Sequence, residues 1–206
     1  MEVIKIDIFS RLKSRRDDIN KDQNPEGVIL KRTVNAVTNH IIFETERLFI
    51  RPYTMDDLDN FFGLNGDEEV MRYIRPAKTM EECREFLQTI IAAYTERPGI
   101  GRWGMFAKDQ NEFIGSFAVI PVEKSDKVQL GYALLKENWG KGYASESVKG
   151  GIQYAFDTLG LKEIAGITFP ENIPSQNVLL KNGFVFDSMI TEDGKPLHLY
   201  MLRRLA

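Results

Sequence analysis

The sequence is poor in the residues that bind metals and form disulfides. Among its 206 residues are one cysteine, Cys83, and two histidines, His40 and His198. A single thiol excludes an intrachain disulfide, and one thiol with two imidazoles supplies too few ligands of these kinds for a zinc site. We therefore expect no metal centre.

The sequence also lacks an excess of positive charge and long apolar runs, which excludes two classes of protein. Lys and Arg number 27 against 30 Asp and Glu, a formal net charge of -3, whereas nucleic-acid binding requires an excess of cations. No apolar run approaches the roughly 20 residues that span a bilayer, and Glu2 and Asp7 interrupt the region where a secretory signal would be apolar. We expect a soluble cytoplasmic protein with no nucleic-acid and no membrane partner.

The remaining composition is that of a folded chain with an appendage. Hydrophobic residues make up 43% of the sequence, and the length suits one large domain, alone or with an added segment. The first 40 residues contain a polar, loop-like stretch at 20–27, and their apolar spacing fits a helix and a strand equally well. We predict an N-terminal extension (residues 1–43) packed on a main domain (44–206).

The main domain is predicted to alternate helices and strands. Thr79 and Glu82 have the spacing of a helix capping box, and an apolar stripe follows them at helical spacing. Cys83 lies on this stripe, which favours a core position over a nucleophile. We expect helices after Thr54, after Thr79, after Tyr143 and over 174–182. The predicted strands are 47–52, 103–108, 112–122, 127–135, 162–169, 184–190 and 197–202. This order indicates an α/β (α+β) domain with a mixed sheet.

A loop with two glycines is the most informative segment. It joins the strand that ends near Leu135 to the helix after Tyr143. Gly140 and Gly142 let the backbone approach an anion, which the N–H groups and the dipole of the following helix would favour, and Lys141 can add a cation. The spacing is neither that of a P-loop nor that of a dinucleotide-binding fingerprint, so a plain strand-to-helix turn is the alternative.

Three motifs carry a family resemblance. The run Trp139-Gly140-Lys141-Gly142-Tyr143-Ala144-Ser145-Glu146 resembles the acyl-CoA loop of the GNAT acetyltransferase superfamily, in its RimJ/RimL-like branch. Residues 46–52 resemble the opening strand of that branch, and residues 172–184 resemble its N-x-x-S-x-x-V-x-x-K-x-G-F helix. The motifs cover about residues 44 to 206 and leave the extension outside.

The resemblance implies both a fold and a co-substrate. The fold is a mixed, mostly antiparallel sheet that splays open beside the strand carrying Gln129 to Leu135, with helices on its faces. Acetyl-CoA would bind with its pantetheine arm along the backbone of Ala133 to Leu135. Its pyrophosphate would lie on the loop, at Trp139, Gly140, Lys141, Gly142, Tyr143, Ala144 and Ser145.

The resemblance also implies catalytic groups. The backbone amide of Leu134 would stabilise the oxyanion, and the Ser175 hydroxyl would donate to the departing thiolate. Asn172 would hold the cofactor arm. The alternative roles are local, since both residues stand where a helix begins, and Asn172 is a good N-cap.

No general base is assigned. Many relatives carry Glu at the position of Gln129, and an amide cannot accept a proton at neutral pH. Ordered water, Glu192, Asp193 and His198 stay open as alternatives, although a lone histidine on a strand is more often structural.

The predicted function is transfer of an acetyl group from acetyl-CoA to a primary amine by direct attack. The acceptor is a protein N-terminal amine or a small molecule such as a polyamine or aminoglycoside. The other alternative is a non-catalytic acyl-CoA-binding module, and a homodimer is one assembly compatible with these readings. Eight acidic residues between Glu44 and Glu69 favour a cationic acceptor, or simply form a solvated acidic face.

Overall fold

The structure is a computed structural model that describes residues 41–123 and 125–204. Expectations for residues 1–40 lie outside these ranges. Eight strands form one sheet in the order β1-β2-β3-β4-β5-β6-β8-β7. The strands are β1 (Phe43–Glu44), β2 (Leu48–Pro52), β3 (Gly101–Ala107), β4 (Phe113–Pro121), β5 (Val128–Leu134), β6 (Glu163–Thr168), β7 (Val185–Glu192) and β8 (Lys195–Arg203). The helices are η2 (Met55–Asp57), α2 (Leu58–Asn65), α3 (Glu68–Met71), α4 (Met80–Ala93), η3 (Lys136–Asn138), α5 (Tyr143–Gln153), η4 (Tyr154–Thr158) and α6 (Ile173–Lys181).

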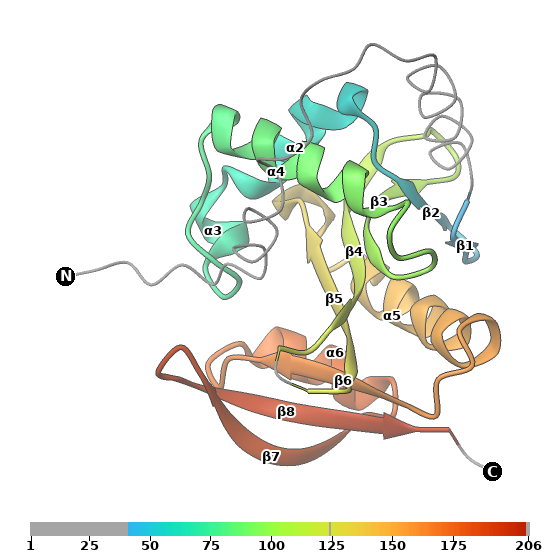
Figure 1. The fold of residues 1–206 in the computed structure, drawn as a ribbon, viewed down its shortest axis with the longest axis vertical. Helices are drawn as coiled ribbons and strands as arrows, with labels where there is room; N and C mark the ends of the chain where they lie inside the picture. The colour runs from blue at the N-terminus through green and yellow to red at the C-terminus, as the bar shows by residue number, and fades with distance from the viewer. Residues whose placement is uncertain (1–40, 124, 205–206) are drawn as a thin grey trace, which may run out of the picture.

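The sheet is split between β5 and β6. All other neighbouring strands pair antiparallel, whereas β5 and β6 are parallel and meet only at Gln129 and Ala165. In Figure 1, β4 and β5 run down the view, while β6, β7 and β8 run across it. The mixed, mostly antiparallel and splayed sheet predicted from the sequence is confirmed.

Local sequence signals account for the helix over the first half of the sheet. At the start of α4, the Thr79 hydroxyl accepts from the Glu82 amide at 3.3 Å, and the Glu82 carboxylate accepts from the Thr79 amide at 2.8 Å. The predicted stripe faces inward, with Cys83 and Leu87 fully buried. The capping box and the core position of Cys83 are therefore confirmed.

Some elements were not predicted from the sequence. The strand β1 has two residues and the helix α3 has four, so neither gives a readable period. The helix α5 continues into a π-helical turn, η4. The strand β1 also begins at Phe43, whose ring packs edge-on against Phe117 at 5.3 Å. The sheet thus includes the last residue that the sequence assigned to the extension.

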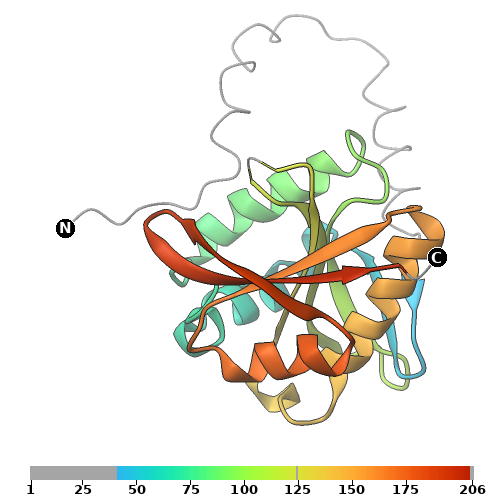
Figure 2. The ribbon, with the colours of Figure 1, turned by 90° about the horizontal axis from the view of Figure 1, so that it is seen from below.

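The helices cover the two faces of the sheet. On one side, α2 contacts β4, α3 contacts β5 and α4 contacts β3. On the other side, α5 lies so close that a Cβ atom at Gly151 would stand 2.2 Å from the Phe117 ring. Figure 2 shows α5 and α6 arranged around the β6–β8 half of the sheet. The split between β5 and β6 therefore has two ends. The helices α5 and α6 lie at one end, and the α2–α3 segment lies at the other.

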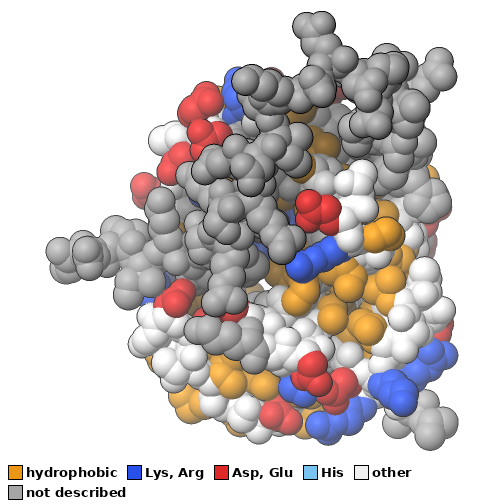
Figure 3. Space-filling view, in the orientation of Figure 1, with side chains coloured by type: hydrophobic (Ala, Val, Ile, Leu, Met, Phe, Trp, Pro, Cys, Tyr) orange, Lys and Arg blue, Asp and Glu red, His pale blue; other side chains and the backbone are white. Residues whose placement is uncertain are grey.

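The surface carries charges of both signs. On the face drawn in Figure 3, acidic and basic side chains lie side by side near the lower edge, and hydrophobic side chains fill the area above them. Among residues 41–123 and 125–204, no helix is long and apolar enough to cross a membrane. The same residues contain no cluster of three or more His, Cys, Asp or Glu side chains suited to a metal ion.

Candidate active site

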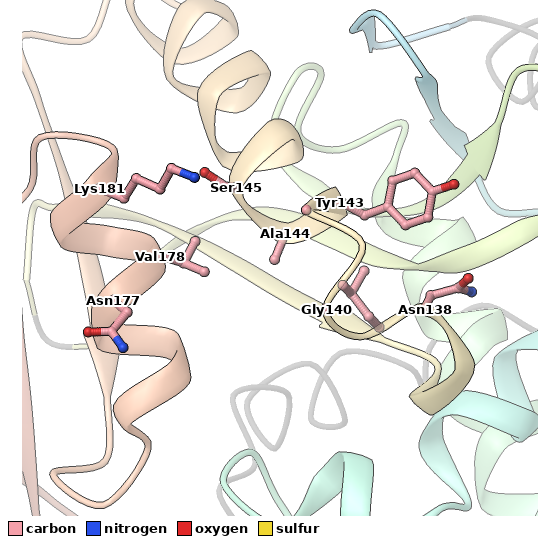
Figure 4. Close-up of a pocket in the computed structure, with 10 residues that line it drawn as sticks. Asn138, Gly140, Tyr143, Ala144, Ser145, Asn177, Val178 and Lys181 are labelled. Carbon is pink, nitrogen blue, oxygen red and sulfur yellow. The ribbon is translucent and has the colours of Figure 1, made fainter.

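Two adjoining cavities follow the split in the sheet. The smaller, of about 260 Å³, lies between the start of α5 and the helix α6 (Figure 4). The larger, of about 560 Å³, runs from the same loop along β5 to the α2–α3 segment. Leu134, Gly140, Ala144 and Val178 line both cavities, so the two form one continuous groove.

The smaller cavity is built around the N-terminus of α5. Gly142 is its N-cap at φ +84°, and Gly140 has φ +73°, so both are in the left-handed region that favours glycine. No side chain caps the helix, whose first bond runs from the Glu146 amide to the Gly142 carbonyl. The amides of Tyr143, Ala144 and Ser145 therefore have no helical acceptor and supply donors for an anion.

Glu146 anchors this loop to the start of β2. Its carboxylate accepts from the Thr45 hydroxyl at 2.6 Å and from the Arg47 amide at 2.8 Å, and it pairs with the Arg47 guanidinium at 2.6 Å. Partial burial alone would raise the pKa of Glu146, but these bonds hold it below the ordinary value. Arg47 in turn donates to the Lys141 carbonyl at 3.1 Å and stacks on the Tyr143 ring. The loop is thus fixed in the conformation that exposes its amides.

Lys181 is a cation beside the N-terminus of α5 to which the sequence analysis assigned no role. It lines the smaller cavity, and its side chain points toward Ser145 (Figure 4). Lys141, which the sequence offered as the cation, lines neither cavity, and its amine donates to the Asn138 side chain at 3.3 Å. The signal for Lys181 is its place as the lysine of the N-x-x-S-x-x-V-x-x-K-x-G-F motif at residues 172–184.

The open edge of β5 provides the second set of backbone donors. The Leu135 amide donates to the Ile114 carbonyl of β4 at 3.1 Å. Because bonding directions alternate along an antiparallel ladder, the amides of Tyr132 and Leu134 point the other way, into the split. The Trp139 indole donates to the Leu134 carbonyl at 2.9 Å, which fixes the end of the strand. The even-numbered residues, rather than Ala133 and Leu135, thus present their amides to the groove.

Ser175 and Asn172 meet Tyr132 in the larger cavity. The Tyr132 hydroxyl donates to Ser175 Oγ at 3.3 Å, and all three residues line the cavity. Burial raises the pKa of Tyr132, with the bond to Ser175 opposing this, so the phenol stays protonated at neutral pH. Asn172 caps α6, since its Oδ1 accepts from the Ser175 amide at 3.2 Å. Tyr132 was not singled out from the sequence because its partner lies 43 residues away.

The candidates for the base are separated by the structure. Gln129 and Glu192 line the larger cavity, whereas Asp193 and His198 line neither. The imidazole of His198 packs edge-on against Phe186, with ring centroids 5.2 Å apart. Among the ionisable candidates, Glu192 alone is therefore a wall residue of the groove.

The acidic face does not form the groove. Of the eight acids between Glu44 and Glu69, only Glu69 lines the larger cavity, and it pairs with Lys136 at 3.3 Å. Lys136 also pairs with Asp67, Lys108 with Glu44, and Arg51 with Asp57. These four carboxylates bind cations of the protein itself, and the expectation of a cationic acceptor stays a prediction.

A split sheet with helix-terminal and strand amides along one groove is the architecture of an acyl-CoA-dependent acetyltransferase. Residues 47–185 match the family described as the acetyltransferase (GNAT) domain. The chain belongs to this family and is an acetyl-CoA-dependent N-acetyltransferase. The expected enzyme class is confirmed.

The similar proteins include curated and solved examples. The chain is 33% identical to the uncharacterized N-acetyltransferase YoaA of Bacillus subtilis, over 73% of this chain and 86% of that protein. A GNAT-family acetyltransferase from Bacillus anthracis has the same fold, with a TM-score of 0.69, 23% identity and coverage of 78% and 97%. RimL, an alpha-N-protein acetyltransferase of ribosomal L7/L12 solved with coenzyme A, has a TM-score of 0.67, 18% identity and coverage of 80% and 98%.

Proposed function

We propose that the chain transfers the acetyl group of acetyl-CoA, bound along the whole groove, directly to a primary amine. The pyrophosphate lies on the amides of Tyr143, Ala144 and Ser145, near Lys181, and the pantetheine arm follows the open edge of β5. The observation that carries the proposal is the continuity of the groove, in which Leu134 and Gly140 line both cavities. One extended ligand can therefore contact the helix N-terminus and the strand edge together.

The thioester is then placed at the end of β5. The Leu134 amide points into the split and can donate to the oxyanion that forms when the amine adds to the carbonyl. One such preorganised donor contributes roughly 3 to 4 kcal/mol. Ser175 accepts from Tyr132, which leaves its own proton for the departing thiolate. Ser175 and Tyr132 thus form a short donor chain to the leaving group.

The acceptor amine must lose a proton before or during attack. Glu192 is the carboxylate on the wall of the groove, and we assign it as the base, acting directly or through water. The amide of Gln129 can orient such a water but cannot take its proton.

We assign the chain to the RimJ/RimL-like branch on its W-G-x-G-Y-A-x-E, E-R-L and N-x-x-S motifs. Members of this branch act on protein N-terminal amines, and a small-molecule amine is the second acceptor class. The cytoplasmic location expected from the sequence stays a prediction.

Thiol release with acetyl-CoA and a panel of amines tests the proposal. We expect release of CoA that depends on the amine and a product heavier by one acetyl group in mass spectrometry. Tight acetyl-CoA binding with no turnover of any amine, including those in a cell extract, would show a binding module instead.

A further inference from the structure

Two arginines that make no ion pair with any described residue lie in the part of the larger cavity that the proposed acetyl-CoA site does not use. Arg75 follows α3 and Arg102 lies on β3, and both line the cavity. Within the described part of the chain, neither guanidinium makes an ion pair. The other arginine on this half of the sheet, Arg51, is by contrast paired with Asp57 through both Nη atoms at 2.8 Å.

The Arg75 guanidinium is held in place, but not all of its N–H groups have a hydrogen-bond acceptor in the portion of the chain that the structure describes. Its Nη2 donates to Oδ1 of Asn65, and its guanidinium stacks on the Phe86 ring at 4.9 Å. Asn65 is itself fixed, because it is buried and donates to the Phe61 carbonyl at 2.8 Å. The Nε atom of Arg75 is buried with no acceptor among the described residues. The side chain is therefore preorganised and keeps an unused donor.

The cross-strand neighbours of Arg102 on β4 and β5 have small side chains or none. It is in register with Ala118 on β4, and Ala118 is in register with Gly131 on β5. Cross-strand partners share a face, and neither Ala118 nor Gly131 fills the space above it. Two strand spacings place the Arg102 backbone about 10 Å from β5, where the thioester is proposed to lie.

Their surroundings disfavour the charged form of both arginines. Burial, and after it the like charge of Arg102, lower the pKa of Arg75 to about 9. Burial also lowers the pKa of Arg102. An arginine stays charged at neutral pH, and charge that is partly buried without a partner is unfavourable unless a ligand supplies the counter-charge. Arg72 and Lys195 on the same lining add positive charge, and the carboxylates of this lining are Glu69, which pairs with Lys136, and Glu192.

We propose that Arg75 and Arg102 bind a carboxylate of the acceptor, so that the acceptor is a small amine that also carries a carboxylate, such as an amino acid. The planar fork of a guanidinium suits a carboxylate, and the cavity leaves the amine to face the end of β5. This inference rests on the proposed acetyl transfer, and it names the acceptor class for the same groove.

Matched acceptors test the inference. Acetyl transfer is measured on the standard amino acids other than proline, aspartate and glutamate and on their α-carboxamides, which keep the primary α-amine and lose the carboxylate. We expect kcat/KM at least tenfold higher for an accepted amino acid than for its carboxamide. The carboxamide amine is less basic and so more often unprotonated, which makes the comparison conservative.

Variants locate the effect. Arg75→Gln and Arg102→Gln are expected to raise KM for the amino acid about tenfold or more, with the carboxamide KM and acetyl-CoA affinity unchanged. Arg84→Gln is the control, because Arg84 is exposed on α4 and lines neither cavity. Melting temperatures of all three variants show whether they are folded.

Three results overturn the inference: carboxamides accepted as well as amino acids, variants that shift both acceptors equally, or no amino acid accepted at all. Turnover of amines without carboxylates would then leave the acetyltransferase proposal standing. Failure of the unaltered protein to bind acetyl-CoA contradicts that proposal and removes the inference with it.

Discussion

Ser175 and Asn172 each combine a local structural role with the chemical role proposed for it. Asn172 accepts from the Ser175 amide to cap α6, and Ser175 accepts from Tyr132 across the groove. For each of these two residues the sequence left two roles open, one in the chemistry of the site and one in the start of the helix. The structure contains the capping bond, and kinetics on variants can separate this structural role from the proposed roles in catalysis and cofactor binding.

Ser175→Ala is expected to lower kcat about tenfold while acetyl-CoA affinity stays nearly unchanged, because the hydroxyl acts mainly on the thiolate that forms in the transition state. Tyr132→Phe should show the same split to a smaller extent. Steady-state kinetics and calorimetry on both variants measure it, with Ser188→Ala on β7 as the control. A Ser175→Ala enzyme that turns over like the parent would assign the leaving-group proton to another donor.

Asn172 can be divided into its two roles by a pair of substitutions. Asn172→Ser keeps a capping oxygen and loses the amide, whereas Asn172→Ala loses both. We expect Asn172→Ala to lower the free energy of unfolding by about 1 kcal/mol and Asn172→Ser to lower it less. Both should weaken acetyl-CoA binding if the amide holds the pantetheine arm. Equal affinities for the parent and Asn172→Ser would leave Asn172 as a cap alone.

At the scale of elements, the loop before α5 depends on its bonds to the start of β2. The sequence predicted both segments as motifs but not their contact, because Arg47 and Glu146 are 99 residues apart. The roles of Arg75, Arg102 and Lys181 were not predictable for the same reason, because they depend on contacts between elements that are far apart in the sequence. The helix α4 was predictable from the helical spacing of its apolar residues, and β4 from a long apolar run, whereas β1 and α3 are too short to show either.

Glu146→Ala is expected to lower the free energy of unfolding by about 1 to 3 kcal/mol at neutral pH, since it leaves the Thr45 and Arg47 donors unpaired. Arg47→Ala should have a smaller effect, because its side chain is 45% exposed and solvent weakens the pair. Denaturant unfolding of the three proteins measures the differences.

The effect of Glu146 should depend on pH in a defined direction. Its pKa is lower in the folded chain than in the unfolded chain, so the stabilisation is complete above the unfolded pKa of roughly 4.3 and is lost as the pH falls through the folded pKa. The difference between parent and Glu146→Ala should therefore shrink below about pH 4. A difference that grows on acidification would contradict this role.

At the scale of the molecule, the family match begins at residue 47, and the sheet begins at Phe43. We propose that the acetyltransferase domain, predicted as residues 44–206, begins with β1 at Phe43 and that the extension before β1 is not part of the acetyl-CoA site. The described chain also places the Ile42 amide 2.8 Å from the Ile50 carbonyl, so the boundary for a stable fragment lies just before β1.

A chain starting at residue 41 is expected to bind acetyl-CoA like the full chain. A chain starting at residue 46 should melt several degrees lower, because it loses β1, the Phe43 ring contact and the Thr45 bond to Glu146. Thermal unfolding and calorimetry on the two chains test both statements. Loss of acetyl-CoA affinity in a folded 41–206 chain would make the extension part of the site.

The central claim is that the N-terminus of α5 binds the pyrophosphate of acetyl-CoA, and calorimetry on Gly142→Asp tests it most directly. The aspartate places a negative charge and a competing acceptor at the amides of α5. Gly160→Asp is the matched control, since Gly160 also has a positive φ and lies beyond the other end of the same helix. We predict acetyl-CoA affinity reduced at least tenfold in folded Gly142→Asp and unchanged in Gly160→Asp. Equal affinity in both variants would contradict the account.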